Sequence, residues 1–186
     1  SDLAAPAYPV KPIKLIAPVA AGGGLDNIAR AVAEKLSRSI GQTVVVENMG
    51  GGGGSIASQA TAKAPADGYT LMIAYVGTHG TNPAIRNLPY DTMKDFTHVG
   101  MVGGSPNVLV VGPELSKVTS LDMLLAELKK RNKPATYGSA GPGTSSHLLV
   151  EQLSVATGIP FLHVPYRGIG PAMVDVMAGR TDIAFP

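Results

Sequence analysis

Three loops rich in glycine, serine and threonine contain the residue types best suited to hold a ligand. They span residues 20–26, 48–55 and 139–146, and each follows an apolar segment and precedes a helical pattern. A helix N-terminus presents unpaired N–H groups and the positive end of the helix dipole. Glycine lets a ligand come close to this backbone, and successive N–H groups form an anion-binding nest. The loops therefore predict a site for a carboxylate, phosphate or sulfate, with ordinary tight connections as the alternative.

The glycine run at residues 50–54 also resembles a nucleotide-binding pattern. Gly52, Gly54 and Ala57 match G-x-G-x-x-A after a predicted strand. This pattern requires an acidic residue about twenty positions on, at the end of the next strand. Residues 74–77 at that place are Ala-Tyr-Val-Gly, and the chain contains no Gly-Lys-Ser/Thr of a Walker loop. A nucleotide- or coenzyme-dependent enzyme on a doubly wound sheet is therefore the alternative function, and it is disfavoured.

The side chains that could catalyse a reaction lack the partners that catalysis needs. Residues 138–141 match the nucleophile elbow G-x-S-x-G only loosely. Ser146 and His147 are adjacent, but neighbours on a helix point in different directions, so His147 is expected to pack or to hydrogen-bond within the fold. The four histidines have no metal-ligand spacing, and the chain has no cysteine. We therefore predict no catalytic residue, no metal and no cofactor.

Two charged residues beside the loops have a structural and a functional interpretation. Asp26 lies at the start of a predicted helix, where a carboxylate caps the helix or braces the loop. A brace is also what a binding loop needs. Arg167, after a predicted strand, would face either an anion or solvent.

Composition sets wider limits on fold and function. The chain has 186 residues, 45% of them hydrophobic and 15% charged, which suffices for one large domain or two small ones. The net charge is +2, and the basic residues are scattered without interleaved aromatics, which disfavours nucleic acid as a partner. No apolar run approaches the ~18 residues that span a membrane. Residues 1–7 are small and Ala-rich, as at a mature end left by signal cleavage.

The loops must be held by strands and helices that alternate along the first hundred residues. Strands are predicted at residues 14–18, 43–47 and 70–75, with helices at 25–40 and 55–63. Period-3.6 spacing of apolar residues supports the first helix, and β-branched residues support the second strand. This order favours a parallel sheet with right-handed crossovers.

The alternation restarts after a Gly-Gly-Ser-Pro break at residues 103–106. Strands are predicted at 98–102 and 108–111 on either side of the break, then at 136–138, 162–164 and 182–185. Helices are predicted at 120–131, with Ser120 as its N-cap, and at 144–157 and 170–178. Two α/β lobes follow, with residues 1–104 in the first and residues 105–186 in the second.

A series of short motifs in a fixed order carries a resemblance to a known family. They are YPVKPI at 8–13, PVAAGG at 18–23, GQTVVVEN at 41–48, APADGYTL at 64–71, NP at 82–83, LPYD at 88–91, YGSAG at 137–141 and HVPYRG at 163–168. From end to end the sequence resembles the Bug-type receptors of tripartite tricarboxylate transporters.

The resemblance implies a type II periplasmic binding protein. Its two lobes would close on an organic acid and deliver the acid to the two-component membrane permease of the transporter. In this family loop amides, hydroxyls and bridging waters hold a carboxylate in the cleft. Carried over, the expected ligand-binding residues are Ala20, Gly22, Gly23, Gly24, Asp26, Ser55, Thr78 and His79 in the first lobe and Ser139, Gly143, Thr144, Ser145 and Tyr166 in the second.

The chain departs from the family pattern in its loops and in its length. Ala21 stands where the family commonly has proline, and the glycine run at 50–54 replaces a more varied stretch, so the resemblance does not identify the acid. Family members are longer, because their chain returns from the second lobe to finish the first. Without that return segment we expect exposed apolar sheet surface and either association with another copy or a marginally stable chain. A shortened receptor that acts as a sensor or interaction module is a third interpretation.

Overall fold

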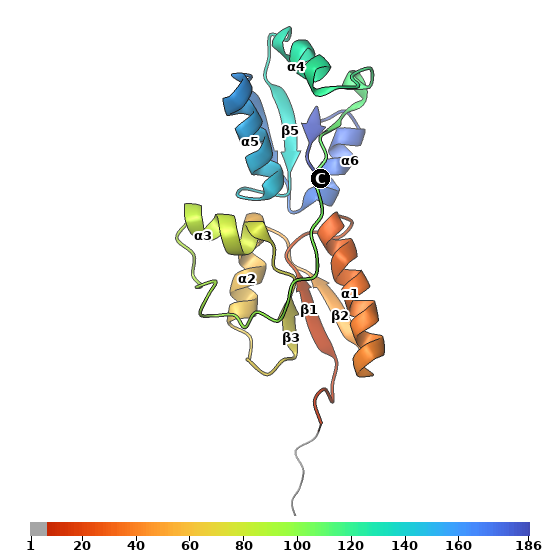
Figure 1. The fold of residues 1–186 in the computed structure, drawn as a ribbon, viewed down its shortest axis with the longest axis vertical. Coiled ribbons are helices and arrows are strands. Elements are labelled where there is room, and N and C mark those ends of the chain that lie inside the picture. The colour runs from red at the N-terminus through yellow and green to blue at the C-terminus, as the bar shows by residue number, and fades with distance from the viewer. Residues whose placement is uncertain (1–6) are drawn as a thin grey trace, which may run out of the picture.

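The computed structural model describes residues 7–186, so residues 1–6 of the Ala-rich N-terminal segment lie outside the described part. Two α/β lobes are stacked end to end (Figure 1). This confirms the predicted two-lobed α/β architecture. The predicted boundary between residues 104 and 105 stays a prediction.

The first lobe is built on a parallel sheet with strand order β2-β1-β3. Its strands are β1 (Ile13–Ala17), β2 (Val44–Asn48) and β3 (Thr70–Met72), and its long helices are α1 (Gly24–Ile40) and α2 (Ser55–Ala62). The apolar face of α1 places Ala29 and Ala33 against Ile13 and Leu15 of the central strand. Helix α1 ends at Gly41, whose N–H donates to Ser37 O at 3.1 Å. The helical period and the glycine stop were both readable in the sequence.

The second lobe has a sheet of strand order β4-β7-β5-β6, in which β4 is antiparallel to β7. Its strands are β4 (Val110–Val111), β5 (Ala135–Ser139), β6 (Phe161–Pro165) and β7 (Ile183–Ala184), and its helices are α4 (Leu121–Lys129), α5 (Ser145–Thr157) and α6 (Ile169–Met177). Tyr137, Val150 and Ile183 are fully buried in its core. The predicted cap of α4 is confirmed, because the Ser120 side chain accepts a hydrogen bond from Met123 N.

The strand predicted at residues 98–102 is wrong. This segment has no regular structure, and Val99 and Met101 are 88% and 95% exposed. A strand requires a neighbour that pairs with its N–H and C=O groups, and residues 98–102 have no such neighbour within the described part of the chain. The apolar alternation alone could not reveal this.

The strand predicted at residues 70–75 ends at Met72, and short helical turns follow it that the sequence did not suggest. The turns after the strand are the π-helical turn η2 (Gly77–Thr81) and the helix α3 (Asn82–Ile85). At the start of these turns the Thr78 hydroxyl accepts a hydrogen bond from Tyr75 N at 3.1 Å. Two 3₁₀ turns lie elsewhere in the chain, η1 (Gly52–Gly54) before α2 and η3 (Pro113–Leu115) after β4. Within residues 7–186 no helix is both long and apolar enough to cross a membrane.

Candidate functional site

The predicted loops meet at the junction of the two lobes. Ala20 N donates to Arg167 O across the junction at 2.7 Å. A Cβ atom added at Gly50 would lie 2.5 Å from Arg167 O, and one added at Gly53 would overlap Pro142 O. The three glycine-rich loops and the turn at Arg167 are therefore in backbone contact, and they face one another.

Four helix N-termini point into this junction, those of α1, α2, α5 and α6. A Cβ atom added at Gly23, just before α1, would lie 2.8 Å from Ile169 at the start of α6. In the same way, Gly53 lies just before α2 and Pro142 just before α5. The positive ends of the helix dipoles and the first-turn N–H groups thus converge, which favours an anion at the junction.

Asp26 braces the first loop from behind. Its carboxylate is 3% exposed and accepts hydrogen bonds from Gly22 N at 2.9 Å, Asn48 Nδ2 at 2.9 Å and Arg30 Nε at 3.1 Å. Burial by itself would raise the pKa of Asp26, but the bonds from Asn48, Gly22 and Arg30 outweigh it and lower the pKa below its usual value. Both carboxylate oxygens are occupied, so Asp26 holds the loop in shape as an ionised group.

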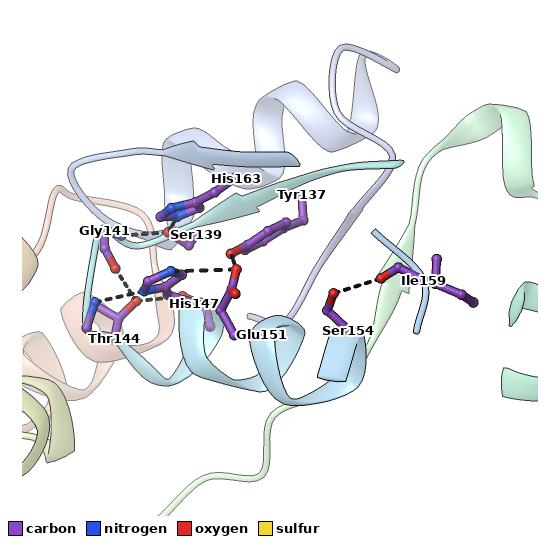
Figure 2. A network of polar contacts seen from close by, with 11 residues as sticks. Tyr137, Ser139, Gly141, Thr144, His147, Glu151, Ser154, Ile159 and His163 are labelled. Atoms are coloured by element: carbon purple, nitrogen blue, oxygen red, sulfur yellow. Dashed lines mark hydrogen bonds and ion pairs between the residues drawn. The ribbon is translucent and has the colours of Figure 1, made fainter. Parts of the chain in front are cut away.

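Hydroxyl groups hold the loop of the second lobe in the same manner (Figure 2). The Thr144 hydroxyl donates to Gly141 O at 2.6 Å, and the Ser139 hydroxyl accepts from Gly141 N at 3.1 Å. Ser139 and Thr144 are 0% and 1% exposed, and Ser139 Oγ also contacts His163 Nε2 at 2.6 Å. These side chains make a rigid loop, and the first-turn N–H groups of α5, such as that of Ser145, remain without an intrahelical acceptor.

A column of stacked rings supports this loop from within the second lobe (Figure 2). His147 and His163 stack at 4.2 Å between ring centroids, and His163 and Tyr137 stack at 4.8 Å. Gly143 N donates to His147 Nδ1 at 3.1 Å. The Tyr137 hydroxyl donates to Glu151 at 2.5 Å. His147 therefore hydrogen-bonds within the fold, as the sequence predicted.

The half-buried histidines of this ring column make the stability of the protein depend on pH. Burial first, and then the charge of His147, lower the pKa of His163 below 6.5, with Glu151 opposing. Below pH 6.5 the unfolded chain therefore binds more protons than the folded chain, and the free energy of unfolding falls until the pH reaches the lower folded pKa. The contribution is at most about 1.4 kcal/mol per pH unit. His79, whose pKa is lowered by burial and by His98, adds to it.

Urea unfolding about one pH unit above and one below 6.5 measures this loss of stability. The parent should lose more stability on acidification than His163→Gln, which cannot titrate there. Equal losses in the two proteins would contradict a role for His163.

The side chains of the remaining predicted residues bond mainly within their own lobe. The Ser55 hydroxyl donates to Gly52 O at 2.9 Å, and Thr78 packs behind Gly54. His79 bonds to Thr78 Oγ1 through Nδ1 at 2.9 Å. Burial and a hydrogen bond to Asp175 raise the pKa of Tyr166 to about 12, so its hydroxyl donates to Asp175 Oδ2 at 2.6 Å.

Several predicted backbone donors are already used in this arrangement. The N–H groups of Ala20, Gly22 and Gly143 donate to Arg167 O, Asp26 and His147. Gly23 and Gly24, at the start of α1, are the predicted first-loop residues whose N–H groups lack an intrahelical acceptor. The structure thus divides the predicted set into framework residues and residues that can still present a donor.

Two residues of this junction, Asn82 and Arg86, were missed by sequence reasoning. Asn82 Nδ2 donates to Gly53 O at 2.9 Å, and Arg86 donates to Gly52 O at 3.0 Å and to Pro142 O at 2.8 Å. The motif NP at 82–83 was the available signal, but it did not indicate a helix or a contact.

Other features of the described residues offer no competing site. Within residues 7–186 no group of three or more His, Asp or Glu side chains is arranged to hold a metal ion. A surface hollow of about 320 Å³ lies at the amino ends of β5 and β6, at the opposite end of the second lobe from the loops. It is lined by residues 128, 129, 131–135 and 157–160, and none of these is a predicted ligand-binding residue.

Sequence comparison relates most of the chain to known proteins. A family model described as "Tripartite tricarboxylate transporter family receptor" matches residues 28–186. Protein BugT of Bordetella pertussis is 41% identical over 182 residues, covering 96% of this chain and 55% of BugT. A UPF0065 protein from the TAR-I ttuE-ttuC' intergenic region of Agrobacterium vitis is 41% identical over 177 residues, covering 95% of this chain and 51% of that protein. The chain spans about half the length of these curated relatives.

Solved structures of similar proteins also align with most of this chain. A structure described as a periplasmic transporter aligns with TM-score 0.92 and 44% identity. Rpa4515 of R. palustris with adipate aligns with TM-score 0.91 and 36% identity, and MatC of Rhodopseudomonas palustris with bound malate with TM-score 0.87 and 29% identity. Each alignment covers 96% of this chain and 60% of the other.

Proposed function

Because this chain belongs to the tripartite tricarboxylate transporter receptor family, we propose that it is a periplasmic receptor that binds a small organic carboxylate between its two lobes. One observation carries the proposal, namely that the N-termini of α1, α2, α5 and α6 meet where the lobes face each other. Their N–H groups and dipoles attract a negative charge without transforming it. The protein would therefore act by reversible binding, with no enzymatic step.

The ligand contacts in this proposal come from the helix starts. Gly23, Gly24 and Ser145 would offer backbone N–H groups. The other predicted residues would frame the site, with Asp26 in the first lobe and the hydroxyls of the second-lobe loop keeping the donors in place. Such preorganised donors bind an anion without first having to be ordered.

The solved relatives support a dicarboxylate as the first ligand to test. Rpa4515 was solved with adipate and MatC with malate, and both ligands carry two carboxylates. A ligand with two anionic ends can engage donors from both lobes at once. It would favour the closed arrangement, because it bridges the lobes only when they are closed. The family supports a membrane permease as the partner that takes up the ligand.

A thermal-shift screen tests the proposal. Malate and adipate should raise the midpoint of unfolding, and stability should grow with ligand concentration as RT ln(1 + [L]/Kd), about 2.7 kcal/mol at a hundredfold excess over Kd. The neutral diamides of the same acids are the matched controls and should produce no shift, because the site attracts negative charge. Stabilisation by ATP or NAD alone would contradict the proposal and favour the nucleotide-dependent alternative.

A further inference from the structure

The short helix α3 and the residue after it lie at the lobe junction, beneath the loop that precedes α5 (Figure 1). We infer that Arg86, assisted by Asn82, is a clasp that holds the two lobes closed. Both are positioning residues that act on the loops and not on a ligand. The expected effect of Arg86 on ligand affinity rests on the proposed function, whereas its expected effect on the distance between the lobes does not.

The Arg86 guanidinium joins one carbonyl group from each lobe. Nη1 donates to Gly52 O at 3.0 Å in the first lobe, and Nη2 donates to Pro142 O at 2.8 Å in the second. The planar guanidinium fork suits two acceptors at once, and bonds from a charged donor are stronger than neutral ones. Arg86 thus links the tips of the two loops that precede α2 and α5.

Asn82 sets the position of this link. Its amide is fully buried, and Nδ2 donates to Gly53 O at 2.9 Å, which fixes the orientation of the amide. Asn82 Oδ1 faces the second lobe, since a Cβ atom added at Gly143 would lie 2.7 Å from it. Arg86 N donates to Asn82 O at 3.0 Å. The clasp is therefore anchored in the first lobe and reaches across to the second.

The clasp is expected to change the balance between open and closed lobes. The hydrogen bond from Ala20 N to Arg167 O belongs to the backbone, whereas the Arg86 bonds can be removed by side-chain truncation. Without Arg86, Pro142 O loses its side-chain donor in the closed form but is hydrated in the open form, while Gly52 O keeps the Ser55 hydroxyl in both. Truncation therefore penalises the closed form selectively. A smaller closed fraction weakens ligand binding by the same factor.

The distance between the lobes tests this directly, without ligand. The chain has no cysteine, so Ser39→Cys in α1 and Val155→Cys in α5 can be labelled uniquely for single-molecule energy transfer. Arg86→Ala should shift the population toward a longer distance. Arg86→Lys should give an intermediate population, because an ammonium keeps the charge but loses the two-pronged geometry. Arg38→Ala, which removes an exposed pair with Glu34 far from the junction, is the control and should leave the distance unchanged.

Ligand binding gives the second measurement, with adipate and malate as probes. Arg86→Ala should weaken the affinity by about tenfold, the equivalent of one charged hydrogen bond, mainly through faster dissociation. The clasp is overturned if Arg86→Ala keeps the parent's distance distribution. If the alanine variant fails to fold, the distance distribution of Arg86→Lys is compared with that of the parent instead, and an unchanged distribution overturns the clasp. If neither acid binds the parent protein, the proposed function fails, but the lobe distance still decides the clasp.

Discussion

Gly53→Ala is expected to keep the lobes apart and to abolish carboxylate binding, whereas Gly158→Ala should leave binding unchanged. The two glycines have nearly the same backbone conformation, with φ of 66° and 70°. A Cβ atom at Gly158 meets nothing within 4 Å, but one at Gly53 overlaps Pro142 O and lies 3.3 Å from Asn82 Oδ1. Both variants carry the same left-handed strain of about 1 kcal/mol. Only Gly53→Ala adds an obstacle to closure.

This pair separates backbone strain from contact between the lobes. Chemical denaturation should give similar losses in the free energy of unfolding for the two variants. Titration with malate or adipate should show a loss of affinity of at least about a hundredfold for Gly53→Ala alone, since a closed form that is 1% populated raises the apparent Kd by that factor. If the two variants bind equally well, the ligand does not require the closed junction.

Asp26→Asn should cost about 2 to 3 kcal/mol of stability and disorder the first loop. The buried carboxylate accepts hydrogen bonds from Gly22, Asn48 and Arg30, and an amide presents its own N–H groups to at least one of these donors. A buried donor left without an acceptor costs about 1 to 3 kcal/mol. Loop disorder should also weaken carboxylate binding, because Gly23 and Gly24 lose their fixed positions.

The stability difference between parent and Asp26→Asn should itself depend on pH. The folded pKa of Asp26 lies below 3.8, so the carboxylate's contribution is complete above that value and is lost as the pH falls through the folded pKa. Urea unfolding across the acid range should therefore show the two proteins converging at low pH. Asp122→Asn in the exposed first turn of α4 serves as control, and a constant difference at every pH would argue against an ionised brace.

Sequence reasoning was most successful for local structure and for the family. The helical period from Leu25 to Ile40 and the Gly41 stop matched α1, and the resemblance to Bug-type receptors is confirmed by the family match over residues 28–186. Both depend on neighbours along the chain or on the order of short motifs. The expectation that glycine-rich loops meet at a common junction also agrees with the structure: within each sheet the parallel strands bring their carboxyl ends to one edge, and the two lobes turn these edges toward each other.

The roles of single side chains were harder to assign. Asp26 was expected both to brace and to bind, and its two oxygens are in fact taken by Gly22, Asn48 and Arg30. Tyr166 was expected to line the cleft, and its hydroxyl bonds to Asp175 of α6. A sequence shows which groups can accept or donate, but not which of several partners lies within reach.

The sequence by itself determined where the longer helices begin and end, where backbone N–H groups are concentrated, and the alternation that makes two α/β lobes. These properties follow from side-chain periodicity and from the conformational range of glycine. The tertiary structure alone decided that residues 98–102 form no strand and that Arg86 joins Gly52 to Pro142, 34 and 56 residues away. The reason is that strand pairing and contacts between lobes depend on groups far apart in the chain, whose distance is set only when both lobes have folded.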